Sequence, residues 1–190
     1  MINKLSNLTT CESEPVVGER REAGTARTLP QPTESSTQFR QVKVSDERLD
    51  RKIERAFSDA RRLRFEDGME SSFSRTLEYL IEQSGTDAID AIARLVKGGT
   101  AEPEVVGEAL RWIGLSEDRG THAYRLWLLC ECLKSQSPYV KDGALLGISF
   151  LDDLGAIGAL KRAIEMEKHT SLREDLRQVL EQLEAQRCRS

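Results

Sequence analysis

The stretch 137–163 combines glycines with charged neighbours, as phosphate-binding loops do: Gly143, Gly147, Gly155 and Gly158 stand near Lys141, Asp142, Asp152 and Asp153. A phosphate loop needs a preceding strand and the order G-x-x-x-x-G-K-[ST]. Here the lysine comes before the glycines, and a helix is predicted before the turn. We therefore interpret Gly143 and Gly147, four residues apart in one helix, as a site of close helix packing. Gly155 is assigned to a turn between helices.

The spacing of cysteines and histidines argues against a metal site or a catalytic pair. Cys130 and Cys132 form a C-x-C pair, whose side chains would point about 200° apart on a helix, and the other two cysteines are Cys11 and Cys188. Neither His122 nor His169 has a ligand at metal-binding spacing. No pair of carboxylates stands apart for acid–base work. We expect free cysteines, no metal, no cofactor, no catalytic residues and no enzymatic activity.

The composition is typical of a charge-rich helical protein. Of the 190 residues, 32% are charged and only 5% are aromatic, and the net charge is −4. This charge gives no general attraction to nucleic acid or to an anionic membrane. Apolar runs are shorter than a bilayer span needs, and the first residues contain no apolar signal-peptide core. We expect a cytoplasmic protein that does not enter the membrane, with reduced thiols.

The chain divides into a tail, 1–44, and a helical body, 45–190. The tail holds ten Ser/Thr residues and three of the five prolines and shows no helical period. Such a segment buries too little apolar surface to offset the entropy lost on ordering. We predict that it is disordered, either as a solvated leader or as a segment that becomes ordered on a partner.

Helical periodicity begins at Ser45, a predicted N-cap. A first apolar stripe has the spacing of an amphipathic helix: Leu49, Ile53, Ala56, Ala60 and Leu63. A second helix is predicted to end at Ser84-Gly85 and to bury Phe73, Leu77, Leu80 and Ile81. Thr86-Asp87 is predicted to cap a third.

The body contains an internal repeat of about 33 residues. Shifted back by 35 residues, the stretch from Pro138 aligns with Pro103–Ile113. Shifted forward by 32, Val140, Ala144, Ile148 and Leu151 align with Leu172, Leu176, Leu180 and Leu183. The expected units are 45–84, 86–116, 121–153 and 154–186, each a helical hairpin. No segment shows sustained strand-like alternation, so we predict an all-α, right-handed solenoid of about four hairpins.

These units resemble HEAT repeats. The body as a whole is similar to short bacterial HEAT-repeat proteins without an assigned activity. The resemblance rests on SPYVKDGALLGI (137–148) and LDDLGAI (151–157), which are similar to the family's Pro, Val-Lys, Ala-Leu and Leu-before-turn pattern. It implies a solenoid whose second helices line a concave face. Some relatives with this fold are hydroxylases with repeated His-Glu pairs, which this chain lacks. A subunit of an enzyme such as a bilin lyase is an alternative, but no residue in the sequence indicates a site for that activity.

The concave face predicts a partner-binding site. Opposite the core positions of 138–151, Tyr139, Leu146 and Phe150 form an apolar stripe where the other units place mainly polar groups. Exposed apolar stripes with polar rims are typical of protein contacts. We predict contacts through Arg111, Leu115, Tyr139, Asp142, Leu146, Phe150 and Gln178. Alternatively, this helix is covered on both faces. Trp127 and Cys130 are expected in the core.

The preferred function is therefore non-catalytic binding of another protein, as an adaptor, inhibitor or immunity protein. A nucleic-acid-binding module is the alternative from another class, with contacts through Arg61, Arg62 and Arg64 in the basic first helix. The body carries 22 basic and 27 acidic residues, a balance that opposes phosphate binding.

Overall fold

A computed structural model of the protein describes residues 46–66 and 69–187, and these ranges form eight α-helices and no strand. The helices are α1 (Glu47–Ala60), α2 (Ser72–Ser84), α3 (Thr86–Gly98), α4 (Pro103–Leu115), α5 (His122–Cys132), α6 (Pro138–Leu151), α7 (Ile157–Met166) and α8 (Thr170–Arg187). Two short 3-10 helices, η1 (Arg119–Thr121) and η2 (Leu154–Ala156), precede α5 and α7. The predicted all-α class is confirmed. The predicted tail lies outside the described residues.

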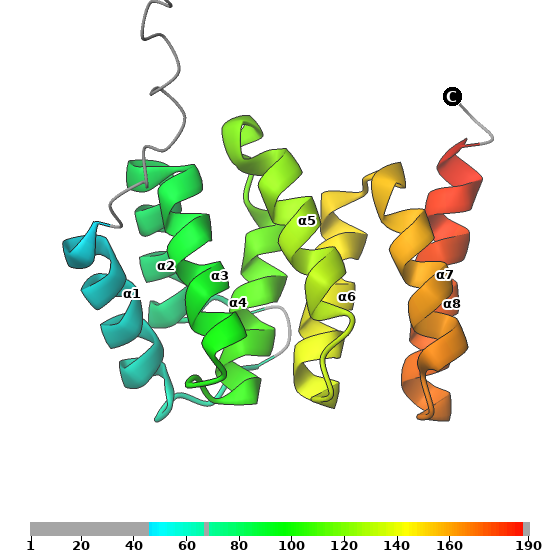
Figure 1. Ribbon diagram of the computed structural model, residues 1–190, viewed down its shortest axis with the longest axis horizontal. Coiled ribbons are helices and arrows are strands. Elements are labelled where there is room, and N and C mark those ends of the chain that lie inside the picture. The colour runs from blue at the N-terminus through cyan, green and yellow to red at the C-terminus, as the bar shows by residue number, and fades with distance from the viewer. Residues whose placement is uncertain (1–45, 67–68, 188–190) are drawn as a thin grey trace, which may run out of the picture. The chain divides into compact units, whose positions relative to one another are not determined.

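The helices lie side by side in chain order, from α1 at one end to α8 at the other (Figure 1). Each predicted unit holds two of them. Contacts also join helices two apart in the chain: α1 packs on α3 and α3 on α5, while α2 packs on α4, α4 on α6 and α6 on α8. The even-numbered helices therefore form one continuous row, and the first three odd-numbered helices form a second.

The observed capping residues agree with the predicted ones at some helix ends and differ at others. Asp46 is the N-cap of α1, and its carboxylate accepts a hydrogen bond from the Arg48 backbone N–H at 3.0 Å. The predicted cap, Ser45, lies outside the described residues. Gly85 ends α2 as predicted, and its φ of 52° is in the left-handed region that favours glycine. Gly85 is also the N-cap of α3, so Thr86 is the first helical residue rather than a cap.

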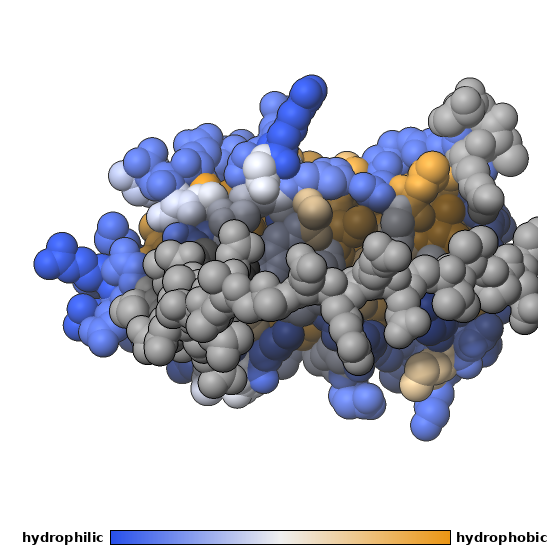
Figure 2. Space-filling view, turned by 45° about the horizontal axis from the view of Figure 1, so that its top comes forward, coloured by the Kyte–Doolittle hydropathy of each residue, from blue (hydrophilic) through white to orange (hydrophobic). Residues whose placement is uncertain are grey.

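The core contains most of the predicted apolar stripes. Leu49, Ile53 and Ala60 are buried in α1, as are all four predicted residues of α2. Leu63 is exposed because α1 ends at Ala60, before the stripe reaches it. Phe57 is buried in the core instead of Leu63, and its ring packs edge-on against Phe73 with ring centroids 5.1 Å apart. On the side shown in Figure 2, hydrophilic residues dominate, and hydrophobic ones are visible at the centre and toward the α7–α8 end.

Trp127 does not fill the core, contrary to expectation. Its side chain is 39% exposed, stacks on Tyr124 and lies under the Lys97 ammonium, which is 4.2 Å from the ring centroid. Leu128 and Leu129, which follow it in α5, are fully buried instead. Cys130 is half-buried, and the deeper thiol is that of Cys132.

The close-packing interpretation of the glycines is confirmed. Gly143 and Gly147 of α6 lie against Gly107 and Gly114 of α4, so the two backbones approach without intervening side chains. A Cβ added at Gly147 would lie 2.6 Å from the Leu110 carbonyl oxygen, closer than real contacts allow. Because the same holds at all four glycines, α4 and α6 form the closest helix pair in the described part of the chain.

A buried arginine that no sequence motif indicated joins α5 to the end of α4. Arg125 is only 2% exposed. Its guanidinium donates to the carbonyl oxygens of Ile113 and Asp118, each at 2.9 Å, and its Nε donates to the Thr121 hydroxyl at 3.0 Å. It thus satisfies a carbonyl in the last turn of α4, where intrahelical donors run out.

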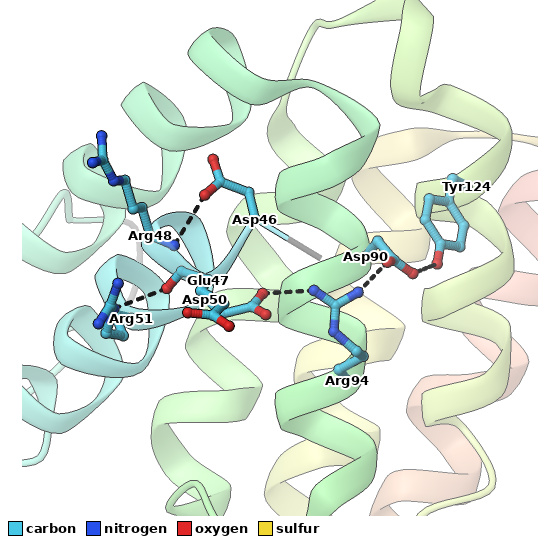
Figure 3. Close-up of polar contacts among 8 residues, drawn as sticks. All are labelled: Asp46, Glu47, Arg48, Asp50, Arg51, Asp90, Arg94 and Tyr124. Carbon is cyan, nitrogen blue, oxygen red and sulfur yellow. Dashed lines mark hydrogen bonds and ion pairs between the residues drawn. The ribbon is translucent and has the colours of Figure 1, made fainter. Parts of the chain in front are cut away.

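Polar contacts connect α1, α3 and α5 (Figure 3). Arg94 of α3 pairs with Asp50 of α1, with Nη2 and Oδ1 2.6 Å apart, and with Asp90 one turn before it in α3. The Tyr124 hydroxyl of α5 donates to Asp90 at 2.5 Å. Burial, together with this hydrogen bond and the adjacent negative charge, raises the pKa of Tyr124 to about 12. The phenol therefore keeps its proton, and the link between α3 and α5, at neutral pH.

Candidate functional site: a groove beside helices α4 and α6

A cavity of about 560 Å³ lies beside the close pair α4 and α6. We call it the α4–α6 groove. Its walls are the segment after α1 with Arg61, Arg64 and Phe65, the start of α4 with Glu102, Glu104 and Glu108, and α6 with Tyr139, Asp142 and Leu146; Arg111 completes it. The cavity thus brings together residues that are far apart in the chain. Some were predicted to bind a partner protein, and others were predicted to bind nucleic acid in the alternative function.

Helix α6 contributes two exposed apolar side chains to the groove, beside Leu63 and Phe65 from the segment after α1. Tyr139 is 57% exposed and Leu146 is 36% exposed, and both line the cavity. Their exposure follows from the glycine contact, because Gly143 and Gly147 turn inward against α4 and leave the other face of α6 outward. Phe150 and Leu115 are also exposed, but they do not line the cavity. The described residues leave the predicted stripe uncovered.

Arg111, which was predicted to contact the partner, is not an exposed side chain. It is only 7% exposed, because its guanidinium turns back along α4 to Glu108, with Nη2 and Oε1 3.0 Å apart. The same Glu108 oxygen accepts the Trp112 indole N–H at 2.6 Å. Arg111 Nε is buried and has no hydrogen-bond partner among the described residues. Arg111 therefore forms part of the wall rather than the rim.

The three arginines after α1 are exposed but do not act as a set. Arg61 donates to the Thr100 carbonyl oxygen at 3.2 Å and lies 4.0 Å from Glu102. Arg64 lines the groove, whereas Arg62 does not. Among the described residues, the lining holds three basic side chains and four carboxylates: Arg61, Arg64 and Arg111 against Glu102, Glu104, Glu108 and Asp142. This mixture does not favour a polyanion such as nucleic acid.

Gln178 is exposed on α8 and lies outside the groove lining. Its neighbour Gln182 donates to the Ser149 carbonyl oxygen at 3.1 Å and to Asp152 at 3.0 Å. This face of α8 therefore meets the end of α6 through amide hydrogen bonds.

His122 has a structural partner, and Cys132 is buried. His122 Nε2 lies 2.7 Å from Asp153 Oδ2, and Asp153 also accepts the Gly155 backbone N–H, which places Gly155 in the turn at η2 as predicted. Burial, together with the adjacent Glu131 charge, raises the pKa of Cys132 to about 12, which leaves it a poor nucleophile at neutral pH. Within 46–66 and 69–187, no cluster of three or more His, Cys, Asp or Glu is placed to hold a metal.

No family model, curated protein or solved structure matches this chain. None of the described helices combines the length and the apolar character that crossing a membrane requires.

Proposed function

We propose that the protein is a non-catalytic, protein-binding module and that its partner occupies the α4–α6 groove. The observation that carries this proposal is the exposure of Tyr139 and Leu146 inside a cavity whose rim is charged. Apolar and aromatic side chains in a partly enclosed site contribute most of the free energy of a typical protein contact. Phe150 and Leu115 extend the apolar surface along the same two helices.

The charged rim of the groove orients the partner and contributes less to the binding free energy than the apolar side chains do. Arg64 makes no hydrogen bond or ion pair with the described residues and faces the groove, as does Glu104. A partner that brings one acidic and one basic group beside its apolar anchor would complement both. Mixed charges of this kind select a register more than they add affinity.

We propose a right-handed, HEAT-like solenoid as the architecture that presents this groove. Support comes from the contacts between helices two apart in the chain, which are the stacking contacts of a repeat array. In such an array the even-numbered row would be the concave face. An adaptor would hold two proteins at once on that face, whereas an inhibitor or immunity protein would suppress the activity of the one that it binds.

The test is affinity purification from the native host with the wild type and with the double variant Leu146→Asp, Phe150→Asp. Both side chains are solvent-exposed, so the variant should melt as the wild type does while losing its partner, because a carboxylate at each anchor must be desolvated on binding. Tyr79→Asp is the matched control, since Tyr79 is an exposed aromatic residue on α2 outside the groove.

Retention of the same partner by the double variant would contradict the proposal. Unfolding of the double variant, with Tyr79→Asp folded, would place the stripe in the core and contradict it as well.

A further inference from the structure

A second cavity, of about 460 Å³, lies between the two C-terminal hairpins. It is lined by the end of α5 and the turn after it, by Lys141 of α6, by one face of α7 from Ala159 to Met166 and by the turn Glu167–His169. We call it the α5–α7 cavity. It shares no lining residue with the α4–α6 groove, so whatever it binds is independent of the proposed partner site.

The α5–α7 cavity is basic although the whole chain has a net charge of −4. Its lining contains four Lys or Arg side chains and one histidine, namely Lys134, Lys141, Arg162, Lys168 and His169. Among the described residues, Glu167 is the only carboxylate in the lining. The α4–α6 groove, with three basic side chains and four carboxylates, has no such excess.

The single carboxylate is already fully engaged. Glu167 is only 5% exposed. Its Oε2 accepts from Lys141 Nζ at 2.5 Å, and its Oε1 accepts the backbone N–H groups of Lys168 and His169 at 2.8 and 2.9 Å. These contacts fasten the turn after α7 to α6. Glu167 therefore holds the wall in place and neutralises Lys141, but not the remaining cations.

Two cations at the cavity differ from Lys134 and Lys141 in having no hydrogen-bond or ion-pair partner among the described residues. Arg162 and Lys168 are exposed, and neither side chain makes a hydrogen bond or an ion pair there. Lys134, by contrast, pairs with Glu131, which lies outside the lining, at 2.5 Å. Arg162 and Lys168 are thus the charges available to a ligand.

Most of the remaining lining is apolar, and Ser135 and Gln136 are its uncharged polar residues. Leu133 and Ala159 are buried, Cys130 and Ala163 are half-buried, and Met166 is exposed. The volume is within the range of small-molecule sites, which are mostly apolar with a few placed polar groups. Guanidinium and ammonium groups beside such a surface match a ligand with one anionic end and one apolar end.

We propose that the α5–α7 cavity binds a small organic anion. Its phosphate or carboxylate group lies between Arg162 and Lys168, and its apolar part lies against Leu133, Ala159 and Ala163. Lys141 and Glu167 act as positioning residues, because their ion pair sets the distance between α6 and the turn that carries Lys168.

The test uses the fluorescent amphipathic anion anilinonaphthalene sulfonate as the probe. We expect saturable binding of one dye per chain to the full, natively folded protein. Arg162→Glu with Lys168→Glu should weaken binding about tenfold or more, since two attractive charges become repulsive. Arg48→Glu with Arg51→Glu changes the net charge equally on the exposed face of α1 (Figure 3) and should leave binding unchanged.

A second variant tests the apolar part without altering charge. Ala163→Phe should fill the cavity and also weaken dye binding, with circular dichroism melts confirming that each variant is folded. Decyl phosphate and decanoate should displace the dye, and the stronger of the two identifies the preferred head group. Decanol, which has no charge, should not displace it.

Several outcomes would overturn the proposal. The first is that the dye shows no saturable binding, and the second is that the α1 control pair weakens dye binding as much as the cavity pair does. The third is that both cavity variants bind the dye as the wild type does. The fourth is that decanol displaces the dye as effectively as the anions do. Loss of dye binding in Leu146→Asp, Phe150→Asp would also overturn it, because the dye would then report the α4–α6 groove. A failed partner capture by that variant leaves this site unaffected, so the two proposals fail separately.

Discussion

Arg125 and Glu167 are charged side chains that the fold buries and surrounds with hydrogen-bond partners. Arg125 reaches the end of α4 and the turn after it, and Glu167 joins α6 to the start of α8. Buried charges persist only when such partners are present, and removing the charge leaves those partners unsatisfied. Both residues are therefore expected to matter for stability rather than for binding.

We expect Glu167 to make the stability of the protein depend on pH. Burial opposes ionisation of this carboxyl, but the hydrogen bonds from Lys141 and from the backbone of His169 and Lys168 outweigh it and lower its pKa to about 2. A depressed folded-state pKa contributes stability above the unfolded value of about 4.3, and the contribution is lost as pH falls through the folded pKa. The shift corresponds to about 3 kcal/mol.

Urea unfolding of the wild type and Glu167→Gln at about pH 6 and about pH 2.5 measures this contribution. The difference in unfolding free energy should be large at the higher pH and should shrink at the lower one. Glu165→Gln, at an exposed position in the last turn of α7, is the control. A difference for Glu167→Gln that does not vary with pH would contradict the prediction.

Replacing Arg125 should destabilise the fold strongly. Arg125→Met keeps much of the volume but leaves the Ile113 and Asp118 carbonyl oxygens without their donor, at about 1–3 kcal/mol for each buried group. Denaturant unfolding should show a loss of about 3 kcal/mol or more. Arg119→Met, at an exposed arginine in η1, should cost little. Equal effects of the two changes would show that the Arg125 hydrogen bonds contribute nothing.

Sequence patterns were least informative for such residues. Arg111 was predicted as a partner contact, yet its guanidinium folds back onto Glu108. Trp127 was predicted in the core, yet it is exposed beside Lys97. A long side chain can reach several partners from one backbone position. Its burial therefore depends on neighbours that local periodicity does not specify.

At the scale of helices, the contact between α4 and α6 depends on glycine. The four residues between the two backbones leave no room for a Cβ: Gly107, Gly114, Gly143 and Gly147. The internal alignment made the two helices equivalent, and the glycine spacing in α6 predicted close packing. The partner glycines in α4 were not predicted, because a pair of facing surfaces cannot be recognised from one of them.

Gly143→Ala tests this contact. Its Cβ would meet the Gly107 backbone, so α4 and α6 must separate, and overpacking of this kind costs about 1–3 kcal/mol or more. Gly158→Ala in α7 is the matched control, because the nearest atom to its Cβ is 3.6 Å away on the flexible Arg162 side chain. That change should be neutral or stabilise by up to about 1 kcal/mol through helix propensity. Thermal unfolding that ranks the two variants the other way round would refute the close-packing account.

At the scale of the whole described domain, the packing is uneven along the row of helices. α4 and α6 bury several residues each, among them Val105, Ala109, Leu110, Ala144 and Ile148. α7 buries only Ala159 and Leu160, and it joins the rest mainly through α8. In arrays of this kind, stability is roughly a sum of local terms, so the C-terminal hairpin should open before the centre.

Hydrogen exchange followed by mass spectrometry measures this order of opening. Amides of α4 and α6 should exchange slowest, and those of α7 and α8 faster by one or more orders of magnitude, since opening free energy falls with buried contact. Lys141→Ala should speed exchange in the first turn of α8 and leave α3 unchanged, because the ion pair with Glu167 is removed. Uniform protection across all eight helices would contradict the prediction.

Local patterns were sufficient for the helical class, for most core positions and for helix ends such as Gly85, because these depend on neighbours within a few residues. Only the tertiary structure brought Arg61 and Arg64 to the same groove as Tyr139 and Leu146, and only it gathered Lys134, Lys141, Arg162 and Lys168 around a second cavity. Both sites join segments distant in the chain, and such pairings arise from packing between helices rather than from the periodicity within one.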